Sequence, residues 1–239
     1  MTTPTPYGTG ASKREEVELM FDRISPKYDL LNRVFSLGID QAWRRKVIRT
    51  LRAEPVQRVL DVATGTADLA LMAARHVPQV TGVDISEGML GLGREKVRQR
   101  GLEGRVELLR ADSARLPFAD GTFDAVMASF GVRNFEDLGA GLSEMARVTR
   151  SGGRILVLEF SRPHAWPIAG LYRFYFHRVM PAIGRLVSRD NAAYTYLPAS
   201  VDAFPDGRAF LNVLERSGWH EGHARPLSGG IAHLYTARR

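Results

Sequence analysis

The sequence of 239 residues contains no cysteine. Disulfide bonds, thiolate metal sites and cysteine nucleophiles are therefore all excluded, and a reducing compartment is compatible with the composition. The opening segment, MTTPTPYGTGAS, lacks the apolar stretch of a secretory signal, and no run reaches the roughly 18 apolar residues of a membrane-spanning helix. We therefore expect a cytoplasmic protein with a flexible tail at residues 1–12.

Lysine is also scarce, because it occurs only at positions 13, 27, 46 and 96, and arginine carries most of the positive charge. The formal net charge of +7 favours anionic partners, either a nucleic acid or the surface of an anionic membrane. Arginines spread over a solvated surface explain the same charge. The charge alone does not choose among these interpretations.

The hydrophobic spacing changes along the chain. Residues 13–53 have helical spacing with interruptions at Ser25-Pro26 and Leu37-Gly38, which predicts an N-terminal cap of two or three short helices. Helical patterns then alternate with short apolar runs of strand type. These runs lie at 56–62, 79–85, 105–112, 123–130 and 153–160. The alternation predicts an α/β fold with a doubly wound, mostly parallel sheet that binds ligands beyond the carboxyl ends of its strands.

The alternation stops after residue 160. Residues 165–205 form an insertion rich in aromatic and apolar side chains, and a helix is expected near 206–217. The last segment has the pattern of an antiparallel hairpin that closes the edge of the sheet. We expect residues 13–239 to form one domain, with residues 165–205 as a helical insertion that faces substrate or membrane.

The turn after the first expected strand reads VLDVATGTADLA, at 59–70. A dinucleotide site needs the closely spaced glycines of GxGxxG, so the single Gly65 argues against nicotinamide binding. Asp61 lies in the strand. Asp84 ends the second strand, where a carboxylate can accept both hydrogen bonds of a ribose diol. The pattern indicates a nucleoside ligand above this turn.

The third strand ends at Asp112, which Ser113 follows. A carboxylate here can accept an amino hydrogen of adenine while a backbone amide faces a ring nitrogen. The glycine turn and the two acids together describe a site for S-adenosylmethionine, and at this level the chain resembles the class I methyltransferases with their Rossmann-like sheet. Ala67 stands where the usual pattern has glycine, and we expect its methyl group to narrow the cofactor site without preventing binding.

Several longer segments match a more specific family. They include FDRISPKYDLLN (21–32), GVDISEGML (82–90), LPFADGTFDAV (116–126), SFGVRNF (129–135), EFSRP (159–163), AYTYLPASVDAFP (193–205) and SGGIAHLY (228–235). From about residue 13 to the end, the chain resembles the demethylmenaquinone and 2-polyprenyl-6-methoxy-1,4-benzoquinol C-methyltransferase family. The resemblance implies methylation of a ring carbon of a polyprenyl quinol in menaquinone or ubiquinone biosynthesis, with Thr66 and Ser129 beside the cofactor.

Methylation at carbon places a demand on the site, because a ring carbon becomes nucleophilic when an adjacent hydroxyl gives up its proton. A developing phenolate then has to be stabilised. Arg133 is our candidate for this charge or for orienting a water, since a guanidinium stays protonated; a structural salt bridge is the alternative. Tyr28 is the second candidate, as a hydrogen-bond partner or proton relay for the ring hydroxyl. The base itself is left open among water, Tyr28 and His177.

The aromatic residues within 165–187 cover too much of a helix for a one-sided amphipathic pattern. We expect one side to pack on the core and another to line a prenyl tunnel or touch lipid, with ordinary core packing as the alternative. Arg173, Arg178 and Arg185 would then meet anionic headgroups. The expected location is the inner face of the cytoplasmic membrane, and a homodimer is left open.

Demethylmenaquinol is the acceptor that we favour, with the benzoquinol of ubiquinone biosynthesis or another small lipid-like molecule as alternatives. Nucleic acid is disfavoured, because no proline-aromatic motif follows the fourth strand and no cysteine is present. A nicotinamide oxidoreductase and a non-catalytic subunit that binds S-adenosylmethionine stay open from other classes. We expect no metal, since His220 and His223 have no further clustered ligands.

Overall fold

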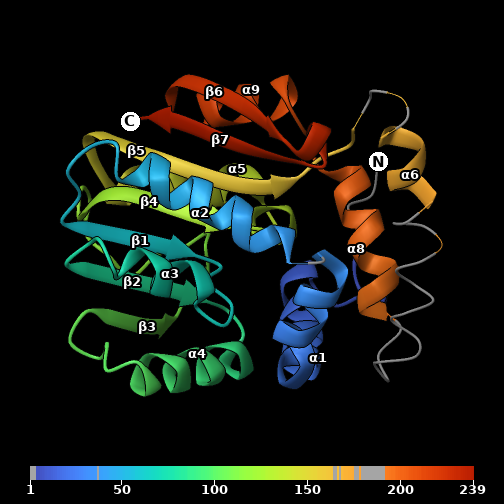
Figure 1. Cartoon of the computed structure of the whole chain (residues 1–239), viewed down its shortest axis with the longest axis horizontal. Coiled ribbons are helices and arrows are strands. Elements are labelled where there is room, and N and C mark those ends of the chain that lie inside the picture. The colour runs from blue at the N-terminus through green and yellow to red at the C-terminus, as the bar shows by residue number, and fades with distance from the viewer. Residues whose placement is uncertain (1–3, 37, 164–165, 167, 175–177, 179–191) are drawn as a thin grey trace.

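The computed structural model describes residues 4–36, 38–163, 166, 168–174, 178 and 192–239, whose arrangement is shown in Figure 1. The helices are α1 (Lys13–Ser36), α2 (Ile39–Leu51), α3 (Asp68–Ala73), α4 (Glu87–Gln99), α5 (Leu138–Val148), α6 (Ile168–Phe174), α8 (Ala192–Ala203) and α9 (Arg208–Arg216). The strands are β1 (Arg58–Val62), β2 (Gln79–Asp84), β3 (Val106–Arg110), β4 (Phe123–Ser129), β5 (Thr149–Phe160), β6 (His220–Leu227) and β7 (Ala232–Arg238). Two short 3-10 turns, η1 (Val132–Asn134) and η3 (Ser228–Gly230), complete the described elements.

The described strands form one sheet of seven strands in the order β3-β2-β1-β4-β5-β7-β6. Strands β1 to β5 pair in parallel, whereas β7 runs antiparallel to both β5 and β6. The prediction of a mostly parallel α/β sheet with a C-terminal hairpin is therefore confirmed. The hairpin extends the sheet at β5, and β6 becomes the edge strand.

Helices cover both faces of the sheet, which is why its central strands read as nearly continuous apolar runs. One core cluster joins the sheet to α2, α3 and α4, and includes Trp43, Leu71 and Leu90. The other joins the opposite face to α5 and α9, and includes Leu142 and Phe210. Helices α1 and α8 cover neither face. They stand beyond the carboxyl ends of the parallel strands, at the right of Figure 1.

Helix α1 corrects one expectation from the sequence, because it continues through Ser25-Pro26 as a single helix of 24 residues. A proline within a helix leaves the carbonyl four residues earlier without its amide donor. Here that carbonyl belongs to Asp22, and the Ser25 hydroxyl donates to it at 2.9 Å. The serine replaces the missing backbone hydrogen bond, so the helix does not end there.

The tail at residues 1–12 was expected to be flexible, and this stays a prediction. Its described part contacts α1 through the Glu16 carboxylate. The backbone amides of Tyr7, Gly8 and Thr9 donate to that carboxylate at 2.6–2.9 Å. These bonds lie at the start of α1, on the side of the molecule that carries the candidate site.

Candidate functional site

A cavity opens where β1, β2 and β4 end and α1 covers them. Among the sequence-predicted residues, its wall includes Tyr28, Gly65, Asp84, Asp112, Ser113 and Ser129. The other three, Asp61, Thr66 and Arg133, are not part of the wall, although each is adjacent in sequence to a residue that is. The structure thus brings residues from five separate segments to one place at the carboxyl edge of the sheet, where parallel sheets bind ligands.

The glycine turn presents its backbone to this cavity. Gly65 has a φ of +57°, a left-handed conformation that favours glycine, and a Cβ placed there would meet only the Tyr28 ring, at 4.0 Å. The amide of Gly65 donates to Asp84 Oδ2 at 2.8 Å, and the amide of Ser86 donates to Oδ1 at 3.0 Å. Burial raises the pKa of Asp84, against the effect of these backbone hydrogen bonds. The carboxylate is therefore held in one orientation at the cavity wall.

Asp61 lies deeper, in β1. The Thr64 hydroxyl donates to its Oδ2 at 2.7 Å, while Oδ1 has no hydrogen-bond partner among the described residues. Burial raises the pKa of Asp61 to about 7, although the Thr64 hydrogen bond, the charge of Arg44 and a backbone hydrogen bond from Ala70 act in the opposite direction. A buried acceptor without a partner is expensive, so this oxygen is suited to a cationic or hydrogen-bonding ligand group.

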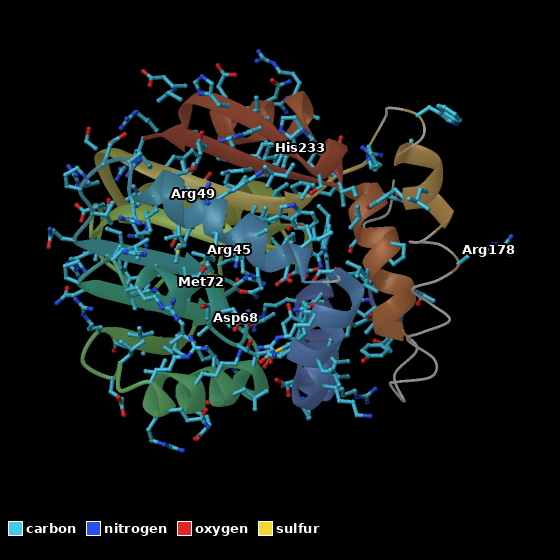
Figure 2. All side chains as sticks on the ribbon, viewed as in Figure 1. Arg45, Arg49, Asp68, Met72, Arg178 and His233 are labelled. Atoms are coloured by element: carbon cyan, nitrogen blue, oxygen red, sulfur yellow. The ribbon has the colours of Figure 1, made fainter. Side chains whose placement is uncertain are left out.

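Thr66 does not face the cavity, because it belongs to a polar cluster that fastens α1 to the turn. Its hydroxyl donates to Asp29 Oδ1 at 2.7 Å. Lys96 Nζ of α4 contacts the same hydroxyl at 2.8 Å, Asp29 at 2.6 Å and Asp68 at 2.7 Å. The labelled Asp68 in Figure 2 lies at the start of α3, next to this turn. Thr66 therefore connects the glycine turn to α1 and α4.

Ala67 also differs from expectation. Its backbone adopts a φ of +65°, and its methyl group packs 3.3 Å from the position that a Cβ on Gly93 would take. The residue is fully buried between the turn and α4, outside the cavity wall. The expected narrowing of the cofactor site is therefore wrong, because the methyl group occupies space next to a glycine of α4.

Asp112 lies two residues beyond the observed end of β3. Its Oδ1 accepts the amide of Ala114 at 2.9 Å, and its Oδ2 accepts Arg14 Nη1 at 2.9 Å. Arg14 comes from α1 and also lines the cavity. Arg14 could not be predicted as a site residue from the sequence, since an arginine at the polar start of a helix has no distinguishing pattern.

Helix α1 makes a further contact with the strand ends. Asp22 Oδ1 accepts the Ser86 hydroxyl at 2.5 Å and the amide of Gly88 at 3.0 Å, so it supplies an acceptor to the N-terminus of α4 from another helix. Glu18 of the same helix pairs with Arg110. With Arg14 and Asp29, these residues form a polar row that holds α1 over the cavity.

Arg133 belongs to η1, directly after β4. Its Nη1 donates to Glu159 Oε1 at 2.8 Å and to the carbonyl of Phe130. The Glu159 side chain is fully buried and that of Arg133 is 9% exposed. Arg133 therefore forms the structural ion pair that was the alternative to a role in catalysis. Its Nε and the Oδ1 of Asn134 nevertheless have no hydrogen-bond partner among the described residues. Asn134 lines the cavity and was missed as a candidate.

Lys13 binds the backbone of the segment that carries Arg133. Its Nζ donates to the carbonyl oxygens of Arg133 at 3.0 Å and Phe135 at 2.8 Å. Burial and the nearby Arg133 charge lower the pKa of Lys13 to about 8, while Glu136 raises it. Because Lys13 is the first residue of α1, the helix over the cavity is also attached to the segment that carries Arg133.

Tyr28 and Ser129 each form a hydrogen bond with another side chain, Tyr28 with Asn32 and Ser129 with Arg44. Burial raises the pKa of Tyr28, while a hydrogen bond with Asn32 acts in the opposite direction. The Ser129 hydroxyl accepts Arg44 Nη1 at 2.6 Å. Arg44 is buried in α2 and stacks over the Phe130 ring, 5.5 Å from its centroid. The sequence shows Arg44 only as one of several arginines in an amphipathic helix, so its burial was not predictable.

The described part of the aromatic insertion exposes large apolar side chains. Trp166 is 88% exposed and Leu171 is 72% exposed, whereas Tyr172 is buried against Val201 of α8. Arg178 is exposed and points away from the protein body in Figure 2. His177, Arg185 and the side chain of Arg173 lie outside the described residues. No described helix is long and apolar enough to cross a membrane.

No group of three or more potential metal ligands of the His, Cys, Asp and Glu types occurs within the described parts of the chain. The expectation that the protein uses no metal stays a prediction.

Residues 9–239 match the ubiE/COQ5 methyltransferase family. The chain belongs to that family. Membership confirms the predicted family and the prediction of a methyltransferase with S-adenosylmethionine as its cofactor.

Relatives cover nearly the whole chain. A protein of Bacteroides fragilis named demethylmenaquinone methyltransferase is 47% identical over 98% of this chain and 96% of its own length. A protein of the same name from Porphyromonas gingivalis is 45% identical, over 97% and 96%. The ubiquinone/menaquinone biosynthesis C-methyltransferase UbiE of Geobacter sulfurreducens is 45% identical, over 95% and 90%.

Solved structures with low identity share the fold. A SAM-dependent methyltransferase of Thermotoga maritima, titled a possible histamine N-methyltransferase, has a TM-score of 0.66 at 15% identity and covers 92% of this chain and 98% of its own. A phosphoethanolamine N-methyltransferase of Haemonchus contortus, solved with S-adenosyl-L-methionine, has a TM-score of 0.61 at 14% identity, over 83% and 52%. These structures confirm the class I methyltransferase fold.

Proposed function

We propose that the protein methylates a ring carbon of a polyprenyl quinol, with demethylmenaquinol as its preferred acceptor. The observation that carries this proposal is the buried Arg133 of η1, which lies between the cavity-lining residues Gly131 and Asn134 in a chain that matches its family from residue 9 to the end. The relatives named demethylmenaquinone methyltransferase support the choice of acceptor. A benzoquinol is the second candidate, supported by the UbiE relative.

The residues at the cavity fit S-adenosylmethionine. Gly65 leaves open space beside the backbone at the cavity wall, and Asp84 presents a fixed carboxylate that suits a ribose diol. The unpartnered Oδ1 of Asp61 suits an ammonium group. Asp112 suits the adenine amino group, because a carboxylate oxygen that accepts one hydrogen bond retains a second lone pair. When bound, the cofactor supplies an electrophilic methyl group.

Arg133 supplies positive charge on the acceptor side. Its ion pair with Glu159 fixes the guanidinium, and the free Nε is a donor for a phenolate oxygen or for a water. Preorganised donors of this kind stabilise negative charge that develops during reaction. Methyl transfer to carbon releases one proton from the ring, and the acceptor of that proton stays open between water and a side chain.

Tyr28 is suited to hydrogen bonding rather than to proton abstraction. Burial raises the pKa of Tyr28, so its phenol stays protonated at neutral pH and can donate to a ring oxygen. Its ring lies 4.0 Å from the Cβ position of Gly65, which places it beside the cofactor turn. We assign Tyr28 the positioning of a ring hydroxyl next to the methyl donor.

We also propose that the insertion contacts the cytoplasmic face of an anionic membrane, from which a polyprenyl substrate would enter. The strongly exposed Trp166 and Leu171 and the exposed Arg178 support this location. Aromatic and aliphatic groups insert at the lipid interface, and each nearby arginine adds roughly 1 kcal/mol with anionic lipids. Flotation with anionic vesicles at low salt tests the contact, and no flotation would contradict it.

The decisive experiment incubates the protein with S-adenosylmethionine and demethylmenaquinol or the corresponding benzoquinol, each supplied reduced and oxidised. We expect one added methyl group by mass spectrometry, on the reduced naphthoquinol ring and not on the oxidised one. Product on the benzoquinol alone would move the assignment to ubiquinone biosynthesis. Cofactor binding without product on any ring would instead indicate a non-catalytic subunit or another acceptor.

A further inference from the structure

Tyr196 has a hydroxyl group that the fold does not use. The residue lies in the middle of α8 and is only 4% exposed. Its hydroxyl is buried and has no hydrogen-bond partner among the described residues. A buried tyrosine hydroxyl is normally paired, because leaving it without a partner costs free energy. A phenylalanine would fill the same space without that cost, so the hydroxyl calls for another explanation.

The surroundings of Tyr196 join the elements that enclose the candidate site. Its ring packs in one cluster with Ala193 of α8 and with Val17 and Met20 of α1. Val17 also lines the cofactor cavity, so Tyr196 lies directly behind that wall. Helix α8 packs on η1 as well, the turn that carries Arg133. Tyr196 therefore stands where α1, α8 and η1 meet.

Two polar atoms of η1, near this junction, also lack hydrogen-bond partners among the described residues. Arg133 Nε and Asn134 Oδ1 of η1 are buried without partners in the described structure. The pKa of Tyr196 is raised to about 12 by burial, and the charges of Arg133 and Glu159 both act on it, Arg133 lowering and Glu159 raising the pKa. The hydroxyl is thus electrostatically coupled to the Arg133–Glu159 pair and stays protonated at neutral pH. Unpaired polar atoms from two elements indicate a small polar ligand group between them.

We propose that the Tyr196 hydroxyl binds one of the two ring hydroxyls of the acceptor, at the junction of α1, α8 and η1. This inference rests on the proposed function. A 1,4-quinol carries two oxygens on opposite edges of its ring, and a buried ring needs a partner for each. Tyr28 serves the oxygen beside the cofactor, and Tyr196 serves the other. Because a phenol can donate to a phenolate or accept from a hydroxyl, it suits that oxygen before and after the ring loses a proton.

Tyr196→Phe tests the assignment, because it removes the hydroxyl and keeps the ring that packs on Val17 and Met20. We expect kcat/KM for the quinol to fall by about 10- to 100-fold, which corresponds to one hydrogen bond to a charged or partly charged oxygen. Calorimetric affinity for S-adenosylmethionine should not change. The melting temperature without ligands should stay the same or rise, because a buried group without a partner is removed.

Tyr235→Phe is the matched control. Tyr235 is also buried, and its hydroxyl accepts the backbone amide of Gly207 at 2.8 Å, in the C-terminal part of the fold. This variant should lose stability and keep kcat/KM. The two substitutions are chemically identical, so opposite effects on stability and catalysis separate a substrate contact from a packing role.

Two acceptor analogues, each with one ring hydroxyl replaced by hydrogen, identify the contact. The loss caused by Tyr196→Phe should disappear with one analogue and persist with the other. An active wild-type protein with an unaffected Tyr196→Phe variant would overturn this inference alone, as would an equal loss with the quinol and both analogues. A wild-type protein that methylates no quinol would overturn the proposed function and this inference with it.

Discussion

The buried ion pair between Arg133 and Glu159 permits a quantitative prediction. Glu159 is fully buried and accepts hydrogen bonds from Arg133 Nη1 at 2.8 Å, from the Arg133 amide at 3.3 Å and from the Phe160 amide at 2.9 Å. Glu159→Gln keeps the size and an acceptor oxygen but removes the charge. The Arg133 guanidinium, 9% exposed, is then left in the interior without its counterion.

The expected loss follows from that uncompensated charge. Breaking a buried pair by removing one partner costs about 3–5 kcal/mol, and we expect the lower end, about 3 kcal/mol, because glutamine still accepts hydrogen bonds. For a chain of this length, the melting temperature should fall by roughly 6–12 °C. Combining Glu159→Gln with Arg133→Met removes the stranded cation, so the double variant should recover at least about 1.5 kcal/mol relative to the sum of the single changes.

Thermal and urea unfolding of the three variants measure these free energies. Glu95→Gln is the control, because Glu95 forms an exposed pair with Arg98 on α4 and such pairs contribute at most about 1 kcal/mol. A coupling energy between positions 133 and 159 below about 0.5 kcal/mol would refute the reasoning. The buried pair would then contribute no more than a surface pair does.

Three further predictions concern the cofactor and the acceptor side. Asp84→Ala should weaken S-adenosylmethionine binding at least about tenfold in calorimetry, because a buried charged acceptor is lost; wild-type affinity would overturn the ribose assignment. Cofactor affinity should rise between about pH 6 and 8, because the pKa of Asp61 is raised to about 7 and only the carboxylate pairs with an ammonium group. Asp61→Asn should remove that pH dependence, and an unaltered slope would assign the titration to another group. Arg133→Ala should spare cofactor binding and lower turnover, whereas unchanged turnover would leave Arg133 with a structural role only.

The raised pKa of Asp61 also predicts how the stability of the protein without cofactor depends on pH. Its pKa is higher in the folded protein than its ordinary value, so protonation favours the folded state, and this contribution is lost as the pH rises toward 7. A cationic ligand group reverses the preference, because it stabilises the ionised carboxylate. The pH dependence of stability without cofactor should therefore run opposite to that of cofactor affinity.

The strands and the glycine turn were predictable because their signals are local. A buried parallel strand requires a short apolar run, and the residue that follows it must lie at the ligand-binding edge of the sheet. Asp84 was placed at the end of its strand on this basis, and the structure agrees. Asp112 was predicted to be the last residue of β3, but the strand ends two residues earlier, at Arg110.

Proline at position 26 indicated a helix end that does not occur. The prediction failed because the compensating donor is the hydroxyl of Ser25, and a serine before a proline is equally typical of a helix boundary. The prediction for the Ala67 methyl group failed for a similar reason. The direction of its methyl group depends on a left-handed backbone and on the space that Gly93 leaves in α4, and neither can be read from the turn alone.

The sequence by itself determined the alternation of strands and helices, the cofactor class and the family, since these depend on local patterns and on long matching segments. Tertiary structure alone decided which polar groups are buried together. Helices distant in sequence supply Arg44 next to Ser129, Lys13 next to the Arg133 backbone and Tyr196 next to the cavity residue Val17. Their chemistry arises from burial and from missing partners, and a side chain acquires both only when the chain has folded around it.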